Sequence, residues 1–330
     1  METKPIKTEL VSILICSRDR RTDLERLVTA LKAIRPSNPF EIVVVEETNT
    51  PSTIEGVNYI PHPVANRGFS YARNLGIQHA TGDIFVFVDD DCLIQGEWLK
   101  HLLNVFKNPA VVGAQGGVTV PPSSGPIGWA ESIIGFPGGG IRRIIVSCGR
   151  TEPTTEISTL NAAYRRKVVE AVGGFDERLK WGGEDDFLAK KACKHGLCLF
   201  APTAVVTHKP RGSLREIWKW FVRRGLVDIF FTRIKDYEAP KRYTHFTVLR
   251  SSLSIKFLLL LSVLCFFPSG WSLPLILFFL SLYILAQHVR YFTIWRKSGA
   301  GLPSFLLIPI VKLTMDLAAD WGRFKGMFRV

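Results

Sequence analysis

The sequence of 330 residues predicts an α/β domain with a mostly parallel sheet, followed by a C-terminal α-helical membrane region. Two observations support this prediction. In the first third of the chain, short apolar runs alternate with amphipathic helical patterns, which is typical of parallel strands covered by helices on both faces. From Phe257 to Leu285, apolar residues dominate and no charged residue occurs, as in segments that cross a bilayer.

Three strands and two helices are expected in the first ninety residues. The strands are Leu10–Ser17, Phe40–Glu47 and Asp83–Asp90, and the helices are Asp23–Ile34 and Ser70–Ala80. Ligands of such sheets bind beyond the carboxyl ends of the strands. We therefore expect the end of the third strand to lie at the mouth of a binding site.

The next part of the chain has a different composition. The stretch Gly113–Gly149 is rich in Gly, Pro and Ser, which predicts loops and a mobile flap. A helix is expected over Lys180–His195, and the apolar run Leu197–His208 is expected to form a further strand.

Three adjacent carboxylates follow the third predicted strand directly: Asp89, Asp90 and Asp91. Their mutual repulsion is costly, so a positive partner is expected beside them. Asp89 and Asp91, with one residue between them, suit a hard divalent cation, Mn²⁺ or Mg²⁺, which binds carboxylate oxygens and shares substrate phosphates. The simpler alternative, a solvated acidic turn, fits less well at the end of a buried strand.

A second acidic group opens the helix predicted near residue 184. The segment runs from Trp181 through Gly182 and Gly183 to Glu184 and Asp185, and Asp186 follows. A helix N-terminus stabilises carboxylates, but capping explains one acid more easily than three. Trp181 offers a ring platform, the two glycines allow close approach of a ligand, and a carboxylate here can act as a general base.

His208 ends the last predicted strand of the α/β domain. A lone histidine is more often structural than a ligand. This one follows a strand that leads away from the acidic helix, so it can complete the shell of a metal.

The net charge of +13 indicates an anionic partner. Lys209–Lys256 contains twelve Lys and Arg residues against four acids, directly before the apolar run. Basic residues next to a membrane segment are typical of the cytoplasmic face, where they also attract anionic lipid. Nucleic acid explains this placement poorly, and membrane lipid explains it well.

Four segments of the C-terminal part have patterns of their own. Leu214–Ile234 mixes aromatic and basic residues at helical spacing, which fits a helix in the membrane interface or an ordinary packing helix. Leu249–Phe267 and Trp271–Val289 approach the length of a membrane span, and the "PSG" between them predicts a helical hairpin. Leu302–Asp320 carries a polar stripe, which favours an interfacial or re-entrant helix over a third span.

The remaining features concern the compartment. The six cysteines are scattered without a Cys-x-x-Cys pair, which favours reduced thiols, and the first ten residues contain no apolar signal-peptide core. We expect a catalytic domain (1–210), a basic amphipathic linker (211–250) and a membrane region (251–330). The catalytic domain should face the cytoplasm at the inner membrane.

Four motifs, in this order and spacing between Val11 and Gly225, resemble the family 2 glycosyltransferases, whose Rossmann-like fold is named GT-A. They are "ILICSRDR", "NRGFSYARNLGIQHATGDIFVFVDDDC", "TLNAAYRRKVVEAVGGFDERLKWGGEDDFLAKKACKHG" and "VTHKPRGS". The resemblance implies an inverting, metal-dependent transferase that uses a nucleotide-diphosphate sugar. It also implies that Asp89 and Asp91 hold the metal and the diphosphate, that Asp185 is the base, and that His208 is a further metal ligand.

The resemblance also implies a nucleotide pocket and an acceptor site. Ser17, Glu46, Arg73 and Asn74 would line the nucleotide pocket, with Asp90 near the ribose; Trp181, Gly182, Gly183 and Glu184 would contact the acceptor. The chain departs from the family at one point: it has "EETN" at Glu46–Asn49, where Asp-Asp-Gly-Ser is usual. The longer side chain of Glu46 would change how the base is recognised.

The expected reaction moves a sugar to a hydroxyl of a lipid-linked or cell-envelope glycan. A base at Asp185 favours a hydroxyl acceptor, because a polyprenyl phosphate is already an anion and needs no base. A polyprenyl-phosphate glycosyltransferase is the first alternative. A non-catalytic membrane module that binds nucleotide-sugars is the second.

Overall fold

The computed structural model describes residues 9–36, 38–180, 182–231, 233, 256, 260, 262 and 269–328. The chain divides into two compact units. The sheet unit comprises Met1–Pro121 and Pro137–Lys209, and the helical unit comprises Pro122–Phe136 and Pro210–Val330.

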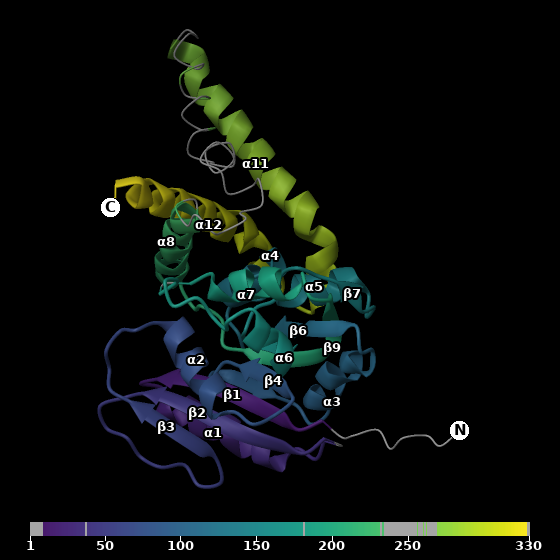
Figure 1. Cartoon of the computed structure of the whole chain (residues 1–330). Helices are drawn as coiled ribbons and strands as arrows, with labels where there is room; N and C mark the ends of the chain where they lie inside the picture. The colour runs from purple at the N-terminus through teal and green to yellow at the C-terminus, as the bar shows by residue number, and fades with distance from the viewer. Residues whose placement is uncertain are drawn as a thin grey trace. The chain divides into compact units, whose positions relative to one another are not determined.

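The sheet unit is built on a nine-stranded mixed sheet (Figure 1) with the order β3-β2-β1-β4-β8-β6-β9-β5, and β7 pairs with β9. The strands β1, β2, β3, β4, β6 and β9 point the same way, whereas β5, β7 and β8 run antiparallel to their neighbours. The predicted α/β domain with a mostly parallel sheet is confirmed. The strands are β1 (Val11–Arg18), β2 (Phe40–Glu47), β3 (Asn58–His62), β4 (Ile84–Val88), β5 (Cys92–Ile94), β6 (Val111–Thr119), β7 (Glu152–Pro153), β8 (Asn161–Arg165) and β9 (Leu197–His208).

Helices cover both faces of this sheet, because its central strands are apolar on both faces. In β1, Ile13 and Ile15 pack in one cluster with α1 and α3, whereas Leu14 packs in the other with α6 and α7. Burial of each such side chain contributes roughly 1.5–3 kcal/mol. The helices of the unit are α1 (Arg21–Ala33), α2 (Phe69–His79), α3 (Trp98–Leu103), the 3₁₀ helix η1 (Asn104–Lys107), α5 (Gly140–Ser147), α6 (Arg166–Ala171) and α7 (Glu184–Ala192).

The pairing of the strands determines which strand ends lie together. β1 pairs in parallel with both β2 and β4. The carboxyl ends of these three strands therefore share one edge of the sheet, and the residues after β1 lie next to the residues after β4. This is the edge at which the sequence predicts a binding site.

The expectation of loops over Gly113–Gly149 is wrong. This stretch contains most of β6, the helix α4 (Pro126–Ile134) and α5. Gly116 lies within β6, where a Cβ atom would overlap the carbonyl oxygen of Ala204. A glycine that is required for close packing inside a strand has the same composition signal as a glycine in a loop.

The helical unit contains α4, α8 (Leu214–Phe231), α11 (Ser269–Ser298) and α12 (Leu302–Phe328). α8 and α12 approach so closely that a Cβ atom on Gly225 would overlap the carbonyl oxygen of Ala319. Arg323 of α12 also forms an ion pair with Asp228 of α8, with Nη2 and Oδ2 2.9 Å apart. α8 is therefore a packing helix along one face, and its opposite face exposes Arg215, Trp218 and Lys219.

The predicted helical hairpin is only partly described. Nearly all of Leu249–Phe267 lies outside the described residues, whereas Trp271–Val289 lies within α11. By length and composition, Leu273–Ser298 and Leu302–Phe328 could each cross a membrane.

Candidate functional site

The three adjacent carboxylates lie in a tight turn between β4 and β5. The amide of Cys92 donates a hydrogen bond to the carbonyl oxygen of Asp89, with N and O 3.1 Å apart. Within this turn Asp90 is fully buried, whereas the side chains of Asp89 and Asp91 are 37% and 13% exposed. The turn therefore separates the three acids into one interior carboxylate and two that reach the surface.

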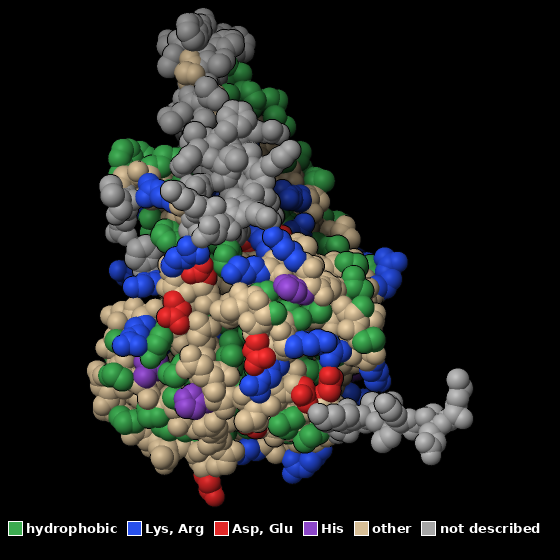
Figure 2. Space-filling view, viewed as in Figure 1, with side chains coloured by type: hydrophobic (Ala, Val, Ile, Leu, Met, Phe, Trp, Pro, Cys, Tyr) green, Lys and Arg blue, Asp and Glu red, His purple; other side chains and the backbone are tan. Residues whose placement is uncertain are grey.

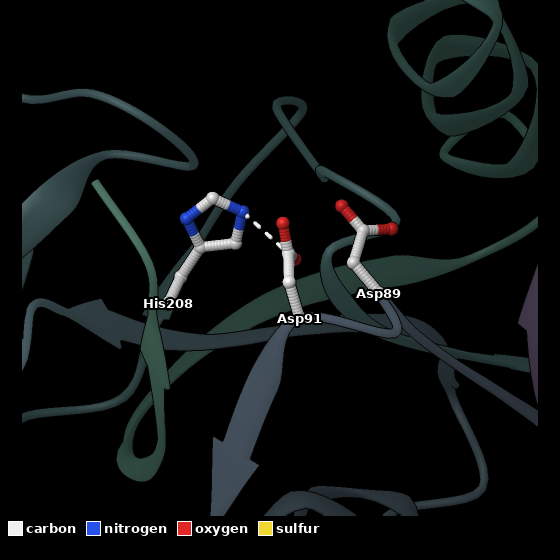
Figure 3. Close-up of side chains that lie close together, drawn as sticks. All are labelled: Asp89, Asp91 and His208. Carbon is white, nitrogen blue, oxygen red and sulfur yellow. Dashed lines mark ion pairs between the residues drawn. The ribbon is translucent and has the colours of Figure 1, made fainter. Parts of the chain in front are cut away.

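His208 is brought to this turn by the pairing of two strands. β5 and β9 run antiparallel, and Cys92 pairs with His208. Figure 3 shows the imidazole beside the carboxylate of Asp91, with Nε2 and Oδ1 3.2 Å apart. One possible ligand atom from each of Asp89, Asp91 and His208 lies within 4.8 Å of the others.

This donor set fits a divalent cation. Two carboxylate oxygens and one imidazole nitrogen suit Mn²⁺, and the carboxylates alone suit Mg²⁺. The pKa of Asp91 is lowered, because contact with His208 and Arg20 outweighs the opposing effect of burial. Asp91 is thus held in the charged form that binds a cation.

Arg20 is the positive partner of the acidic turn, and the sequence patterns did not single it out. It follows β1, and its Nη2 and Nη1 atoms lie 2.8 Å from Oδ1 of Asp90 and 2.5 Å from Oδ2 of Asp91. The sequence did contain a signal, because three adjacent acids require a nearby cation and Arg20 follows a strand that ends at the same edge. The carboxyl of Asp90 is the most perturbed of the three: burial raises its pKa to about 7, although Arg20 and Ser17 favour the charged form.

Arg73 joins the two acidic groups that the sequence presents separately. This buried α2 residue forms an ion pair with Glu184 in the first turn of α7. Its Nη2 atom also lies 3.9 Å from Oδ1 of Asp89. The acidic turn and the N-terminus of α7 are therefore parts of one site.

Among the three acids that open α7, Asp185 differs from its neighbours. Glu184 pairs with Arg73 and Asp186 pairs with Lys190. In the described part of the chain, no ion pair involves Asp185. Burial raises its pKa to about 7, and the neighbouring Glu184 adds to this effect while Arg73 opposes it. A carboxyl with this pKa can exchange a proton near neutral pH.

Two of the residues expected in the nucleotide pocket have other partners. Oε2 of Glu46 accepts hydrogen bonds from the hydroxyl of Tyr59 at 2.6 Å and from Nη1 of Arg21 at 3.0 Å. The side-chain amide of Asn74 bonds to the backbone of Phe175, donating to its carbonyl oxygen and accepting from its amide. Asn74 therefore packs α2 against the loop before α7, and nucleotide contacts of both residues stay predictions.

Three of the remaining expected residues, Ser17, Gly182 and Gly183, lie at or near the two acidic groups. Ser17 is buried at the end of β1. Gly182 and Gly183 have φ angles of 132° and 84°, in the left-handed region that favours glycine, and they allow the chain to turn into α7. Trp181 lies outside the described residues.

Comparison with known proteins shows what this chain is similar to. Residues 12–173 match the family model described as glycosyl transferase family 2. A pre-mycofactocin glycosyltransferase of Mycobacterium tuberculosis is 28% identical over 228 residues, which cover 65% of this chain and 45% of the relative. The succinoglycan biosynthesis protein ExoM of Rhizobium meliloti is 28% identical over 215 residues, which cover 64% of this chain and 60% of the relative. The chain thus spans about half the length of these two relatives.

A third relative and a solved structure cover more of their own length. The glucosyl-dolichyl phosphate glucuronosyltransferase of Haloferax volcanii is 26% identical over 257 residues, which cover 70% of this chain and 79% of the relative. The structure of mannosyltransferase PcManGT from Pyrobaculum calidifontis, in complex with GDP-Man and Mn²⁺, has a TM-score of 0.55 and 18% identity to this chain. That match covers 98% of this chain and 88% of PcManGT, and it shows the GT-A fold that the motifs predict. Residues 12–173 of this chain therefore match a glycosyl transferase family 2 domain.

Proposed function

We propose that this chain is a metal-dependent, inverting glycosyltransferase that moves a sugar from a nucleotide-diphosphate sugar to an acceptor hydroxyl. One observation supports this most directly: Arg73 links the cluster of Asp89, Asp91 and His208 to the helix turn that presents Asp185. A site for a diphosphate with its cation and a site for a base are thus adjacent. A non-catalytic module that binds nucleotide-sugars would not need the second of these.

The bound cation and Asp185 have separate roles in the proposed reaction. When bound at Asp89, Asp91 and His208, Mn²⁺ or Mg²⁺ would neutralise charge that develops on the departing diphosphate. Asp185 accepts the proton of the acceptor hydroxyl, whose oxygen forms a bond to the anomeric carbon as the bond to the diphosphate oxygen breaks. Because Asp185 is the single carboxylate proposed as base, one in-line displacement with inversion is the simplest course.

The proposed acceptor is a lipid-linked or cell-envelope glycan. The names of the relatives support this class, since one acts on glucosyl-dolichyl phosphate and another serves succinoglycan biosynthesis. The proposed base argues for a hydroxyl over a polyprenyl phosphate, which is already an anion. Acceptor profiling with a glycosylated lipid diphosphate and with a bare polyprenyl phosphate distinguishes the two.

We also propose that the chain acts at the cytoplasmic face of the inner membrane. Side chains of α11 such as Leu273, Phe278 and Leu285 are exposed, and Figure 2 shows hydrophobic side chains along the visible part of this helix. α12 buries one face and exposes an apolar stripe on another. The stripe consists of Leu302, Leu306, Ile310, Leu317, Trp321, Phe324 and Phe328. A helix with one face against protein and one apolar face outside fits the membrane interface.

The substitution Asp185→Asn tests the catalytic part of the proposal. It keeps the shape of the side chain and removes its ability to take a proton. We expect transfer to fall by at least about 100-fold, whereas binding of the nucleoside diphosphate with Mn²⁺, measured by titration calorimetry, should stay within about twofold. The matched control is Asp186→Asn, which changes the next acid along α7 and should transfer sugar at a rate near that of the wild type. Normal transfer by the Asp185 variant would contradict the assignment of the base.

A further inference from the structure

We propose that Arg20 is a positioning residue for the metal site: its guanidinium group holds Asp91 in the orientation in which a divalent cation can bind. This inference rests on the proposed function, because it assumes that Asp89, Asp91 and His208 hold a cation. Arg20 itself would not touch the metal.

The contacts of Asp91 divide its two oxygens between two partners. Oδ2 lies 2.5 Å from Nη1 of Arg20, and Oδ1 lies 3.2 Å from Nε2 of His208. Oδ1 faces His208 and has no hydrogen-bond partner among the described residues, which makes it the oxygen that would hold the metal, so Arg20 fixes the rotation of the carboxylate from its other side. Partners of this kind commonly set the orientation of a metal ligand.

Asp90 anchors the guanidinium group. Its carboxylate is fully buried and lies 2.8 Å from Nη2 of Arg20, whereas the side chain of Arg20 is 42% exposed. A buried carboxylate is stable only when it is paired, so Asp90 restricts where Arg20 can lie. The planar guanidinium presents two nitrogens at once, one to each carboxylate, which a lysine ammonium cannot reproduce with the same geometry. This contact gives Asp90, which the sequence resemblance places near the ribose, a second task in the site.

The charge of Arg20 alone would have the opposite effect. A cation this close to Asp91 repels a divalent ion, so its removal would strengthen metal binding if charge dominated. If orientation dominates, its removal weakens metal binding. The sign of the change therefore separates the two effects.

The test measures the dissociation constant of Mn²⁺ for the full-length protein in detergent, by electron paramagnetic resonance of free Mn²⁺. For Arg20→Ala we expect the constant to rise roughly 10- to 100-fold. Arg20→Lys, which keeps the charge but loses the fork, should also bind Mn²⁺ more weakly than the wild type. The melting temperature of each variant without metal shows that it is folded, and Arg20→Lys preserves the test if Arg20→Ala does not fold.

Arg18→Ala is the matched control. Arg18 lies two residues away in the same segment and has the same charge, and its ion pairs are with Asp19 and Glu47. We expect this variant to bind Mn²⁺ within about twofold of the wild type. Unchanged or tighter binding by Arg20→Ala, or wild-type binding by Arg20→Lys, would overturn the inference and leave the proposed function standing. Failure of the wild type to bind Mn²⁺ would overturn both.

Discussion

The carboxyl group of Asp185 connects burial to the pH dependence of the proposed reaction. Its pKa is raised to about 7, first by burial and then by Glu184. A base acts in its deprotonated form, so the active fraction is complete above this pKa and falls as the pH drops through it. We expect kcat to decrease by about tenfold per pH unit below pH 7.

This profile should be measured as kcat at saturating donor, acceptor and Mn²⁺, so that weaker metal binding in acid does not contribute. The variant Asp186→Asn is the control. It removes the carboxylate next to Asp185 and leaves Asp185 in place, so its kcat should fall at low pH as that of the wild type does. A constant kcat from pH 5 to pH 8 would contradict the role of Asp185.

Single residues of the site could be predicted where the local pattern is costly. Asp89 and Asp91 stand out because three adjacent acids after a buried strand repel one another. Arg20 and the link from Arg73 to Glu184 could not be predicted in the same way. They depend on which strands are neighbours and on how α2 packs, and no short window of sequence contains that information.

At the scale of elements, α12 bears on the membrane proposal. Lys312 pairs within the helix with Asp316, Arg323 pairs with Asp228 of α8, and the inner face of α12 contacts α8 and α4. A helix covered by protein along one face cannot be surrounded by lipid. We therefore expect α12 to lie in the interface with its exposed stripe toward the acyl chains.

Labelling of single cysteines tests this orientation in a cysteine-free variant reconstituted in vesicles. One variant carries an environment-sensitive fluorophore at position 306 and the other at position 324. Both should show the blue-shifted emission of a shallow apolar environment, because Leu306 and Phe324 belong to the exposed stripe. The control position is Gly212, an exposed residue before α8. Quenching of the two labels from opposite sides of the vesicle by a membrane-impermeant quencher would indicate that α12 crosses the membrane, because the two positions lie about 27 Å apart along the helix.

Elements were predictable to different degrees for physical reasons. The strands Phe40–Glu47 and Leu197–His208 were predicted with the bounds that the structure has, because each is a continuous apolar run between polar turns. α4 and α5 were missed because glycines around them serve close packing and turns with positive φ, such as Gly138 and Gly139. The predicted helix at Lys180 starts only at Glu184, since the glycine pair before it adopts left-handed backbone angles.

At the scale of the whole molecule, the helical unit is formed by two stretches that are separate in the sequence. α4 comes from Pro122–Phe136, which interrupts the sequence of the sheet unit, yet it belongs to the helical unit. In that unit, buried Glu131 of α4 forms an ion pair with Arg211. Glu131 and Arg211 are eighty residues apart, so their pairing leaves no local signal in the sequence. The change of composition near residue 210 can therefore be predicted from the sequence, whereas the assignment of α4 to the helical unit cannot.

The most direct test of the proposed function is consumption of donor by the full-length protein with and without a divalent cation. A panel of radiolabelled nucleotide-sugars would be incubated with membranes or detergent-solubilised protein, with Mn²⁺ or with EDTA. We expect at least one donor to be consumed with Mn²⁺, and Asp91→Ala to reduce its turnover by roughly 100-fold or more. Glu170→Ala, at an exposed acid of α6, should not change it. Equal turnover in EDTA, normal turnover by Asp91→Ala, or no consumption of any donor would contradict the proposal.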